Sequence, residues 1–130
     1  MFNNKTVLIT GGTGSFGKNF AKFLLTNYKL KKLIIFSRDE FKQFKMAEEI
    51  KDSRLRFFLG DIRDLPRLQR AFNGVDIVIH AAALKQVPIL EYNPFEAIKT
   101  NIIGSQNVIE ASIDNKVSKA LLISSDKAAQ

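Results

Sequence analysis

The chain has 130 residues, 45% of them hydrophobic and 25% charged, and its formal net charge is +7. It has no cysteine and a single histidine, His80, which excludes disulfides, thiolate catalysis and metal sites built from several cysteines or histidines. The length suits one domain with one core, and no apolar run is long enough to cross a membrane. Because the basic residues are scattered without an aromatic stripe, charge alone does not decide between nucleic acid and a small phosphate-bearing ligand.

Five short aliphatic and β-branched runs predict buried parallel strands. They cover residues 6–10, 33–36, 55–59, 76–80 and 120–124. The stretches between them have the apolar spacing of amphipathic helices. We expect the buried face of the first helix to carry Phe16, Phe20, Phe23 and Leu24. We expect the buried face of the second helix to carry Phe41, Phe44 and Ala47.

The third and fourth helices have recognisable ends. In the third, Asp64 is placed as the N-cap before the apolar residues Leu65, Leu68 and Phe72, and Asn73-Gly74 ends the helix. In the fourth, the N-cap is Asn93, followed by Pro94 at the first helical position and Glu96 at the third. Its expected buried face consists of Phe95, Ile98, Ile102, Ile109 and Ile113.

The strict alternation of strands and helices predicts a doubly wound α/β fold of the Rossmann type, with strand order 3-2-1-4-5. In such a sheet the ligand crevice lies at the carboxyl ends of the strands, where the order reverses. We expect residues 1–130 to form one dinucleotide-binding domain. It is incomplete, because a sixth strand and a C-terminal substrate domain are absent from the sequence.

The first strand runs directly into TGGTGSFG, in which Gly11, Gly14 and Gly17 have the spacing G-x-x-G-x-x-G. Gly11 permits a tight turn, Gly14 lets the backbone approach a pyrophosphate, and Gly17 allows close packing of helix on strand. The following helix presents free N–H groups and the positive end of its dipole to the phosphates. A glycine triplet alone is a weak signal, but at a strand-to-helix junction it predicts dinucleotide binding.

The end of the second strand predicts which dinucleotide binds. An NAD site places a carboxylate there for the ribose hydroxyls, whereas an NADP site uses a hydroxyl or an arginine for the 2′-phosphate. Ser37 and Arg38 occupy this place, so we predict NADP. Asp39 leaves an alternative, since a shift of two residues would make it the ribose carboxylate, although it more naturally opens the next helix. After the third strand, Asp61 suits the adenine amino group and Ile62 its ring, unless Asp61 is a simple turn residue.

Together these motifs resemble those of a known family. The segments are TGGTGSFG, SRDEFKQ, GDIRD, HAAALKQVPILEYNPFEAIKTNIIGSQNVIEA and SSDKA, and they extend over the whole chain. They resemble the extended short-chain dehydrogenase/reductases that modify nucleotide sugars, above all the inverting UDP-N-acetylglucosamine 4,6-dehydratases. Many relatives share the glycine motif, whereas LKQVP…EYNPFE together with SSDKA is far more discriminating.

The resemblance implies a site for NADP. The pyrophosphate would contact Thr13, Gly14, Ser15 and Phe16. The adenosine 2′-phosphate would be surrounded by Ser37, Arg38, Asp39, Glu40, Phe41 and Lys42, and the adenine would be held by Asp61 and Ile62. Ala81 would line the path of the nicotinamide ribose, Lys85 would reach both cofactor and substrate, and Asn101 resembles the family's structural asparagine.

The resemblance also implies a dehydratase that acts on UDP-N-acetylglucosamine or a related nucleotide sugar. Ser125 occupies the Ser/Thr position of the catalytic set, Lys127 would be the base at C5 and Asp126 the acid at C6. Ser125 and Asp126 would also contact the substrate. The sugar C4 would be oxidised with hydride passing to NADP⁺, water would be eliminated across C5 and C6, and the hydride would return to C6. Without the resemblance, Asp126-Lys127 would be an ordinary exposed charge pair.

Part of the family's machinery lies outside this sequence. The Tyr-x-x-x-Lys motif should follow a short distance beyond Ser125, and Tyr28-Lys32, which has the same spacing, lies away from the carboxyl edge of the sheet. We therefore expect part of a longer, cytoplasmic, homo-oligomeric enzyme that is inactive as this chain alone, with no nucleic-acid, membrane or metal partner. The alternatives are a nucleotide-sugar epimerase, a retaining dehydratase or a non-catalytic NADP-binding module. His80 is expected to be a packed, hydrogen-bonded residue without a catalytic role.

Overall fold

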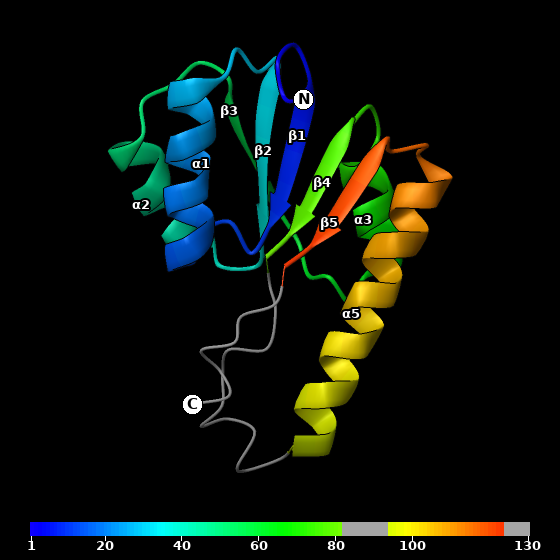
Figure 1. The fold of residues 1–130 in the computed structure, drawn as a ribbon. Coiled ribbons are helices and arrows are strands. Elements are labelled where there is room, and N and C mark those ends of the chain that lie inside the picture. The colour runs from blue at the N-terminus through cyan, green and yellow to red at the C-terminus, as the bar shows by residue number, and fades with distance from the viewer. Residues whose placement is uncertain (82–93, 124–130) are drawn as a thin grey trace.

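The computed structural model describes residues 1–81 and 94–123 of the chain. Within these ranges, five parallel strands form one sheet with the order β3-β2-β1-β4-β5 (Figure 1). The strands are β1 (Thr6–Thr10), β2 (Lys32–Ser37), β3 (Leu55–Leu59), β4 (Ile77–His80) and β5 (Lys119–Leu122). The predicted order is confirmed, and the predicted strand ends are close to the observed ones. The prediction that the fifth strand is buried is wrong, because β5 lies at the edge of the sheet and is exposed.

Helices cover both faces of the sheet (Figure 1). One face carries α1 (Ser15–Asn27) and α2 (Glu40–Glu49), and the other carries α3 (Leu65–Ala71) and α5 (Pro94–Asp114). Because successive strand residues point to opposite faces, the continuous aliphatic runs supply both layers of core. The first layer includes Val7, Ile9, Leu33, Ile35, Ala21, Leu24 and Met46. The second includes Leu8, Phe36, Val78, Leu68, Phe72, Val108 and Ala111.

The predicted ends of α3 are confirmed. Oδ1 of Asp64 accepts a hydrogen bond from the backbone N–H of Arg67 at 3.2 Å, so Asp64 caps the helix. Leu68 and Phe72 are buried, and Gly74 has a φ of 79°, in the left-handed region where a helix commonly ends. α5 is present from Pro94 onward, while its predicted cap Asn93 and the side chains of Phe95, Glu96 and Ile98 lie outside the described residues. In the described part of the chain, no helix has the length and apolar character needed to cross a bilayer.

The predicted buried faces of α1 and α2 are largely wrong. Phe16 and Phe23 of α1 are exposed, as are Phe41 and Phe44 of α2. Of the predicted residues of α1, Leu24 is buried and Phe20 is partly buried against the core. The other buried residues are Gly17 and Ala21 in α1, and Gln43 and Met46 in α2. Small residues at the contact let a helix approach the sheet closely, so the large aromatic side chains lie to the side. There Phe16 stacks on Phe20 and Phe20 on Phe23.

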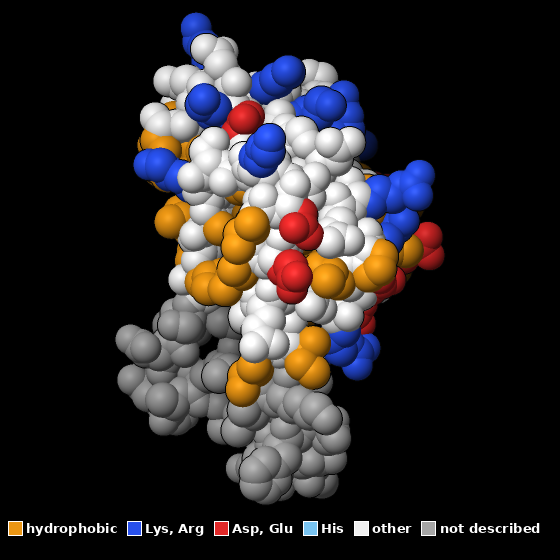
Figure 2. All heavy atoms as spheres, turned by 90° about the vertical axis from the view of Figure 1, so that its right-hand side faces the viewer, with side chains coloured by type: hydrophobic (Ala, Val, Ile, Leu, Met, Phe, Trp, Pro, Cys, Tyr) orange, Lys and Arg blue, Asp and Glu red, His pale blue; other side chains and the backbone are white. Residues whose placement is uncertain are grey.

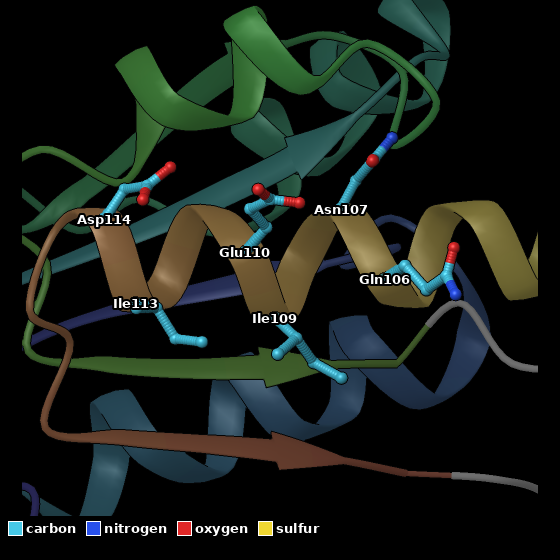
Figure 3. A pocket seen from close by; sticks show the side chains of 6 residues that line it. All are labelled: Gln106, Asn107, Ile109, Glu110, Ile113 and Asp114. Carbon is cyan, nitrogen blue, oxygen red and sulfur yellow. The ribbon is translucent and has the colours of Figure 1, made fainter.

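The predicted buried face of α5 is also wrong where the structure describes it. Ile102, Ile109 and Ile113 are exposed, and the buried positions of the helix are Gly104, Val108, Ala111 and Ser112. Figure 2 shows hydrophobic side chains gathered on the side of the molecule that carries α5. In Figure 3, Ile109 and Ile113 project from the side of α5 opposite Glu110 and Asp114, and all four line a depression of 510 Å³. This depression lies on the outer surface of α5 and away from the glycine-rich loop.

Candidate dinucleotide-binding site

The loop between β1 and α1 lies at the carboxyl edge of the sheet, where the strand order reverses. β1 has β2 on one side and β4 on the other, so this loop opens between the ends of these strands. Gly11 has a φ of 70°, which glycine adopts without strain. Its N–H donates to the carbonyl of Phe36 at 2.9 Å, and its carbonyl accepts from the N–H of Gly14 at 3.2 Å. The predicted tight turn at Gly11 is confirmed.

Gly17 has no room for a side chain. A Cβ at this position would lie 2.4 Å from Cα of Gly12 and 2.8 Å from the carbonyl oxygen of Gly11. The close packing predicted for Gly17 is therefore confirmed. Gly12, which the predicted set omits, has a similar constraint, because its Cβ would lie 2.8 Å from Cγ2 of Ile35 on β2. The two consecutive glycines in TGGTG could have indicated this constraint at Gly12, but the G-x-x-G-x-x-G spacing does not include the second of them.

No side chain in the described part of the chain caps the N-terminus of α1. Gly14 is the N-cap, no side chain accepts a hydrogen bond there, and the first turn holds no acidic residue. Helices usually place Ser, Thr, Asp or Asn at this point to satisfy the first N–H groups. Free N–H groups combined with the positive end of the helix dipole suit an anion. Ser15 and Phe16 are exposed beside this helix end and Thr13 is partly exposed, so the donor set fits a pyrophosphate.

The last residue of β2 and the residues that follow it differ sharply in their surroundings. Ser37 is buried, whereas 72% of the Arg38 side chain is exposed and able to meet a ligand. Oδ1 of Asp39 accepts a hydrogen bond from the backbone N–H of Lys42 at 3.0 Å, which makes Asp39 the N-cap of α2. This agrees with the interpretation that Asp39 opens the helix. Lys42 and its neighbours Glu40 and Phe41 form the exposed first turn of α2.

Asp61, in the loop after β3, is held by two arginines. Its Oδ2 lies 2.6 Å from Nη2 of Arg63 and 3.6 Å from Nη1 of Arg38. Its Oδ1 accepts from the backbone N–H of Arg63 at 2.9 Å, as a turn aspartate does. Hydrogen bonds from Arg63, with a smaller contribution from the charge of Arg38, lower the pKa of Asp61 to about 2. The ionised carboxylate therefore links the ends of β2 and β3 at neutral pH.

Ile62 connects the same loop to α5. A Cβ on Gly104 would lie 2.3 Å from Cδ1 of Ile62, so a glycine at residue 104 lets the helix lie against this loop without displacing the Ile62 side chain. Nδ2 of Asn107 donates to the carbonyl of Ile62 at 3.0 Å. The segment that is predicted to hold adenine is thus fixed against the second helical layer.

His80 ends β4 in the interior, with only 3% of the residue exposed. Its Nδ1 shares a hydrogen bond with Oγ1 of Thr10 at the end of β1, and its Nε2 lies 3.4 Å from Oγ of Ser105 on α5. Burial lowers the pKa of His80 below its usual value. The prediction of a packed, hydrogen-bonded histidine is confirmed. The next residue, Ala81, is buried, and its N–H donates to the carbonyl of Thr10 at 3.1 Å.

The described residues therefore bring together the dinucleotide part of the predicted site. Lys85, Ser125, Asp126 and Lys127 lie outside them, as does the side chain of Asn101. One further residue at this edge is missing from the predicted set. Gln43 of α2 is buried and donates hydrogen bonds to Ser37, and no apolar or charge pattern in the sequence indicates it.

Comparison with known proteins places this site in a family. The family model described as "Polysaccharide biosynthesis protein" matches residues 7–130. The UDP-N-acetylglucosamine 4,6-dehydratase (inverting) of Campylobacter jejuni is 60% identical over 98% of this chain, which covers 38% of that protein. The UDP-glucose 4-epimerase of Rickettsia prowazekii is 50% identical, again over 98% of this chain and 38% of its own length.

Solved structures give the same result. Pen from Bacillus thuringiensis matches with a TM-score of 0.87 and 47% identity, covering 94% of this chain and 37% of that one. DesIV, a dTDP-glucose 4,6-dehydratase from Streptomyces venezuelae solved with NAD bound, matches with a TM-score of 0.79 and 30% identity, covering 88% and 38%. The chain thus spans well under half the length of the relatives it matches. It has the Rossmann-type fold of the short-chain dehydrogenase/reductases that act on nucleotide sugars, and it belongs to the polysaccharide biosynthesis protein family.

Proposed function

We propose that this chain is the NADP-binding part of an inverting UDP-N-acetylglucosamine 4,6-dehydratase. One observation carries the proposal. A glycine-rich loop whose tight packing and open helix end suit a pyrophosphate occurs in a chain that is 60% identical to such a dehydratase. The chain covers 38% of the length of that relative, so the dehydratase activity of the whole protein is proposed here as well.

The cofactor would lie along the carboxyl edge of the sheet. The pyrophosphate would bind over residues 13–16, the 2′-phosphate beside Ser37 and Arg38, and the adenine near Asp61 and Ile62. The nicotinamide end would extend toward Ala81 and onward to residue 85. Two features support NADP over NAD. The guanidinium of Arg38, next to the end of β2, is exposed and could bind the 2′-phosphate. The carboxylate of Asp39 caps α2, so it is already engaged and is less suited to bind the ribose hydroxyls of NAD.

The catalytic groups would come from the SSDKA motif. When bound, the nicotinamide would accept a hydride from the sugar C4 and return it to C6. The tyrosine of the expected Tyr-x-x-x-Lys motif would take the C4 hydroxyl proton, and C5 would regain a proton as the hydride returns. Lys127 would remove the C5 proton, which the C4 ketone makes acidic, and Asp126 would protonate the departing C6 hydroxyl so that it leaves as water. Ser125 would hydrogen-bond the reacting sugar, and Lys85 would contact both the sugar nucleotide and the cofactor. These roles rest on the family motif.

A nucleotide-sugar epimerase is the second candidate, because the Rickettsia prowazekii relative is named as a UDP-glucose 4-epimerase. Elimination of water needs both a base and an acid at adjacent carbons, whereas inversion at C4 needs neither at C5 and C6. The Asp126-Lys127 pair therefore favours a dehydratase. The product formed by the full-length protein from UDP-N-acetylglucosamine separates the two: a 4-keto-6-deoxy sugar supports the proposal, and a C4 epimer overturns it.

The cofactor part is tested by calorimetric titration of this chain with NADP⁺ and with NAD⁺. We expect NADP⁺ to bind more tightly, because Ser37 and Arg38 would contact the 2′-phosphate. Tighter binding of NAD⁺ would overturn the choice of cofactor. Failure of the folded chain to bind either dinucleotide would overturn the assignment of the loop.

A further inference from the structure

Gln43 is a polar residue in an unexpected place. It lies in the first half of α2 with 8% of the residue exposed, while its neighbours Lys42 and Phe44 are exposed. A buried amide costs free energy unless hydrogen bonds replace its contacts with water. The hydrogen-bond partners of the Gln43 amide therefore explain why this residue is buried.

The Gln43 amide faces the ends of β2 and β3. Its Nε2 lies 3.2 Å from the carbonyl oxygen of Ser37, 3.0 Å from Oγ of Ser37 and 3.2 Å from the carbonyl oxygen of Phe58. A carbonyl oxygen can only accept a hydrogen bond, so two carbonyls at this distance require the NH₂ group, and not the amide oxygen, to face the strands. The group has two hydrogens for three acceptors, so at least one hydrogen is shared between two of them. The orientation of the amide is thereby fixed.

The orientation of the amide decides what the Ser37 hydroxyl can do. A hydroxyl has one proton to donate. At Ser37 the oxygen accepts a hydrogen from Gln43, and its own proton has no acceptor among the described residues, so it is available to a ligand. The carbonyl of Ser37 already accepts from the N–H of Gly60 at 2.9 Å, which holds the residue in register at the sheet edge. Gln43 and Gly60 thus hold Ser37 in place, so that its hydroxyl can donate a hydrogen bond to a ligand.

We infer that Gln43 is a positioning residue for cofactor choice: its amide presents the Ser37 hydroxyl as a donor to the 2′-phosphate of NADP. The inference rests on the proposed function. A phosphate oxygen carries charge and only accepts, so a held donor favours it strongly. The ribose hydroxyl at the same place in NAD is uncharged and can donate as well as accept, so it gains less from a fixed donor.

The test replaces Gln43 with methionine, which keeps the length of the side chain and removes its donors. Affinities of the chain for NADP⁺ and NAD⁺ are measured by calorimetry. We expect Gln43→Met to weaken NADP⁺ about tenfold, because the Ser37 hydroxyl would no longer be oriented for its hydrogen bond to the charged 2′-phosphate, and to change NAD⁺ by less than about twofold. Gln106→Met, at an exposed position of α5, is the matched control and should change neither affinity.

A double-mutant cycle with Ser37→Ala tests whether Gln43 acts through Ser37. In the Ser37→Ala background, Gln43→Met should cost NADP⁺ little further affinity, because the hydroxyl that it positions is gone. An unchanged tenfold loss in that background would overturn the inference, as would equal losses for NADP⁺ and NAD⁺ in the single variant. If Gln43→Met does not fold, Gln43→Asn keeps an amide that is too short to reach the strands, and the same outcomes apply.

Failure of the inference can be distinguished from failure of the proposed function. A wild-type chain that binds neither dinucleotide, or prefers NAD⁺, contradicts the proposed function. A wild-type chain that prefers NADP⁺ and keeps that preference in Gln43→Met contradicts only the role of Gln43.

Discussion

Arg38 is the residue on which the choice of cofactor depends most directly. Its guanidinium is largely exposed and its only ionic partner among the described residues is Asp61, at 3.6 Å. Asp61 is bound more closely by Arg63, at 2.6 Å. An exposed pair at the longer distance contributes little to stability, so a phosphate can recruit Arg38 without releasing Asp61 from its place between β2 and β3.

We predict that Arg38→Ala weakens binding of NADP⁺ by about tenfold or more and changes that of NAD⁺ by less than about twofold, since only NADP carries the 2′-phosphate. The loop should keep its shape, because Arg63 still holds Asp61. Titration with each dinucleotide measures the effect. Arg56→Ala, which removes an exposed arginine of β3, is the control and should leave both affinities unchanged. Equal losses for the two dinucleotides in Arg38→Ala would mean that Arg38 does not contact the 2′-phosphate.

At the scale of the elements, the sequence predicts strands better than helix orientation. The strands β1, β2 and β4 are largely buried, so each contains a continuous aliphatic run that is bounded by polar residues and turns, whereas the edge strand β5 is exposed. In a helix, periodicity marks an apolar stripe without showing which side packs on the sheet. In α5 the stripe of Ile109 and Ile113 is exposed, while Val108 and Ala111 are buried in the core and Gly104 packs on Ile62. Contact with a sheet selects small residues as well as apolar ones, and a hydrophobicity pattern does not record this.

The candidate site was predictable for the same reason that the strand order was. In a parallel sheet every strand ends at one edge, so the motifs that follow β1, β2, β3 and β4 must meet there. The glycine-rich loop, Arg38 and Asp61 could be placed from their positions in the chain alone. Gln43 could not, because a glutamine within a helix is usually a surface residue and its burial depends on the carbonyls of two strands.

The orientation of α5 leads to a prediction about stability. We predict that Val108→Ala lowers the free energy of unfolding by about 1–3 kcal/mol, because it leaves a cavity in the core between α5 and the sheet. Ile113→Ala, which removes more apolar atoms from an exposed position of the same helix, should change it by less than about 0.5 kcal/mol. Urea denaturation followed by circular dichroism measures both. A larger loss for Ile113→Ala would show that the exposed stripe is buried in solution.

At the scale of the whole molecule, His80 forms a polar contact between the centre of the sheet and the helical layer that contains α3 and α5. His80 contacts Thr10 across the β1–β4 pair and lies beside Ser105 of α5, at the point where the strand order reverses. A buried imidazole is stable there only while it is neutral, because protonation would leave a charge in the interior. The sequence has one histidine, so no other side chain has an ordinary pKa between 5 and 7.

The titration of His80 should therefore be visible in the pH dependence of the free energy of unfolding. Burial places its pKa in the folded state below the unfolded value of 6.5. Between these two pKa values the unfolded chain binds a proton that the folded chain does not, so the free energy of unfolding falls as the pH falls. The slope reaches at most about 1.4 kcal/mol per pH unit, and the loss ends once the pH is below the folded pKa. Urea denaturation at closely spaced pH values from about 7 to 5 measures this slope. His80→Asn should flatten the profile in this window, whatever its effect on stability at neutral pH. A slope that survives the substitution would show that His80 is not its source.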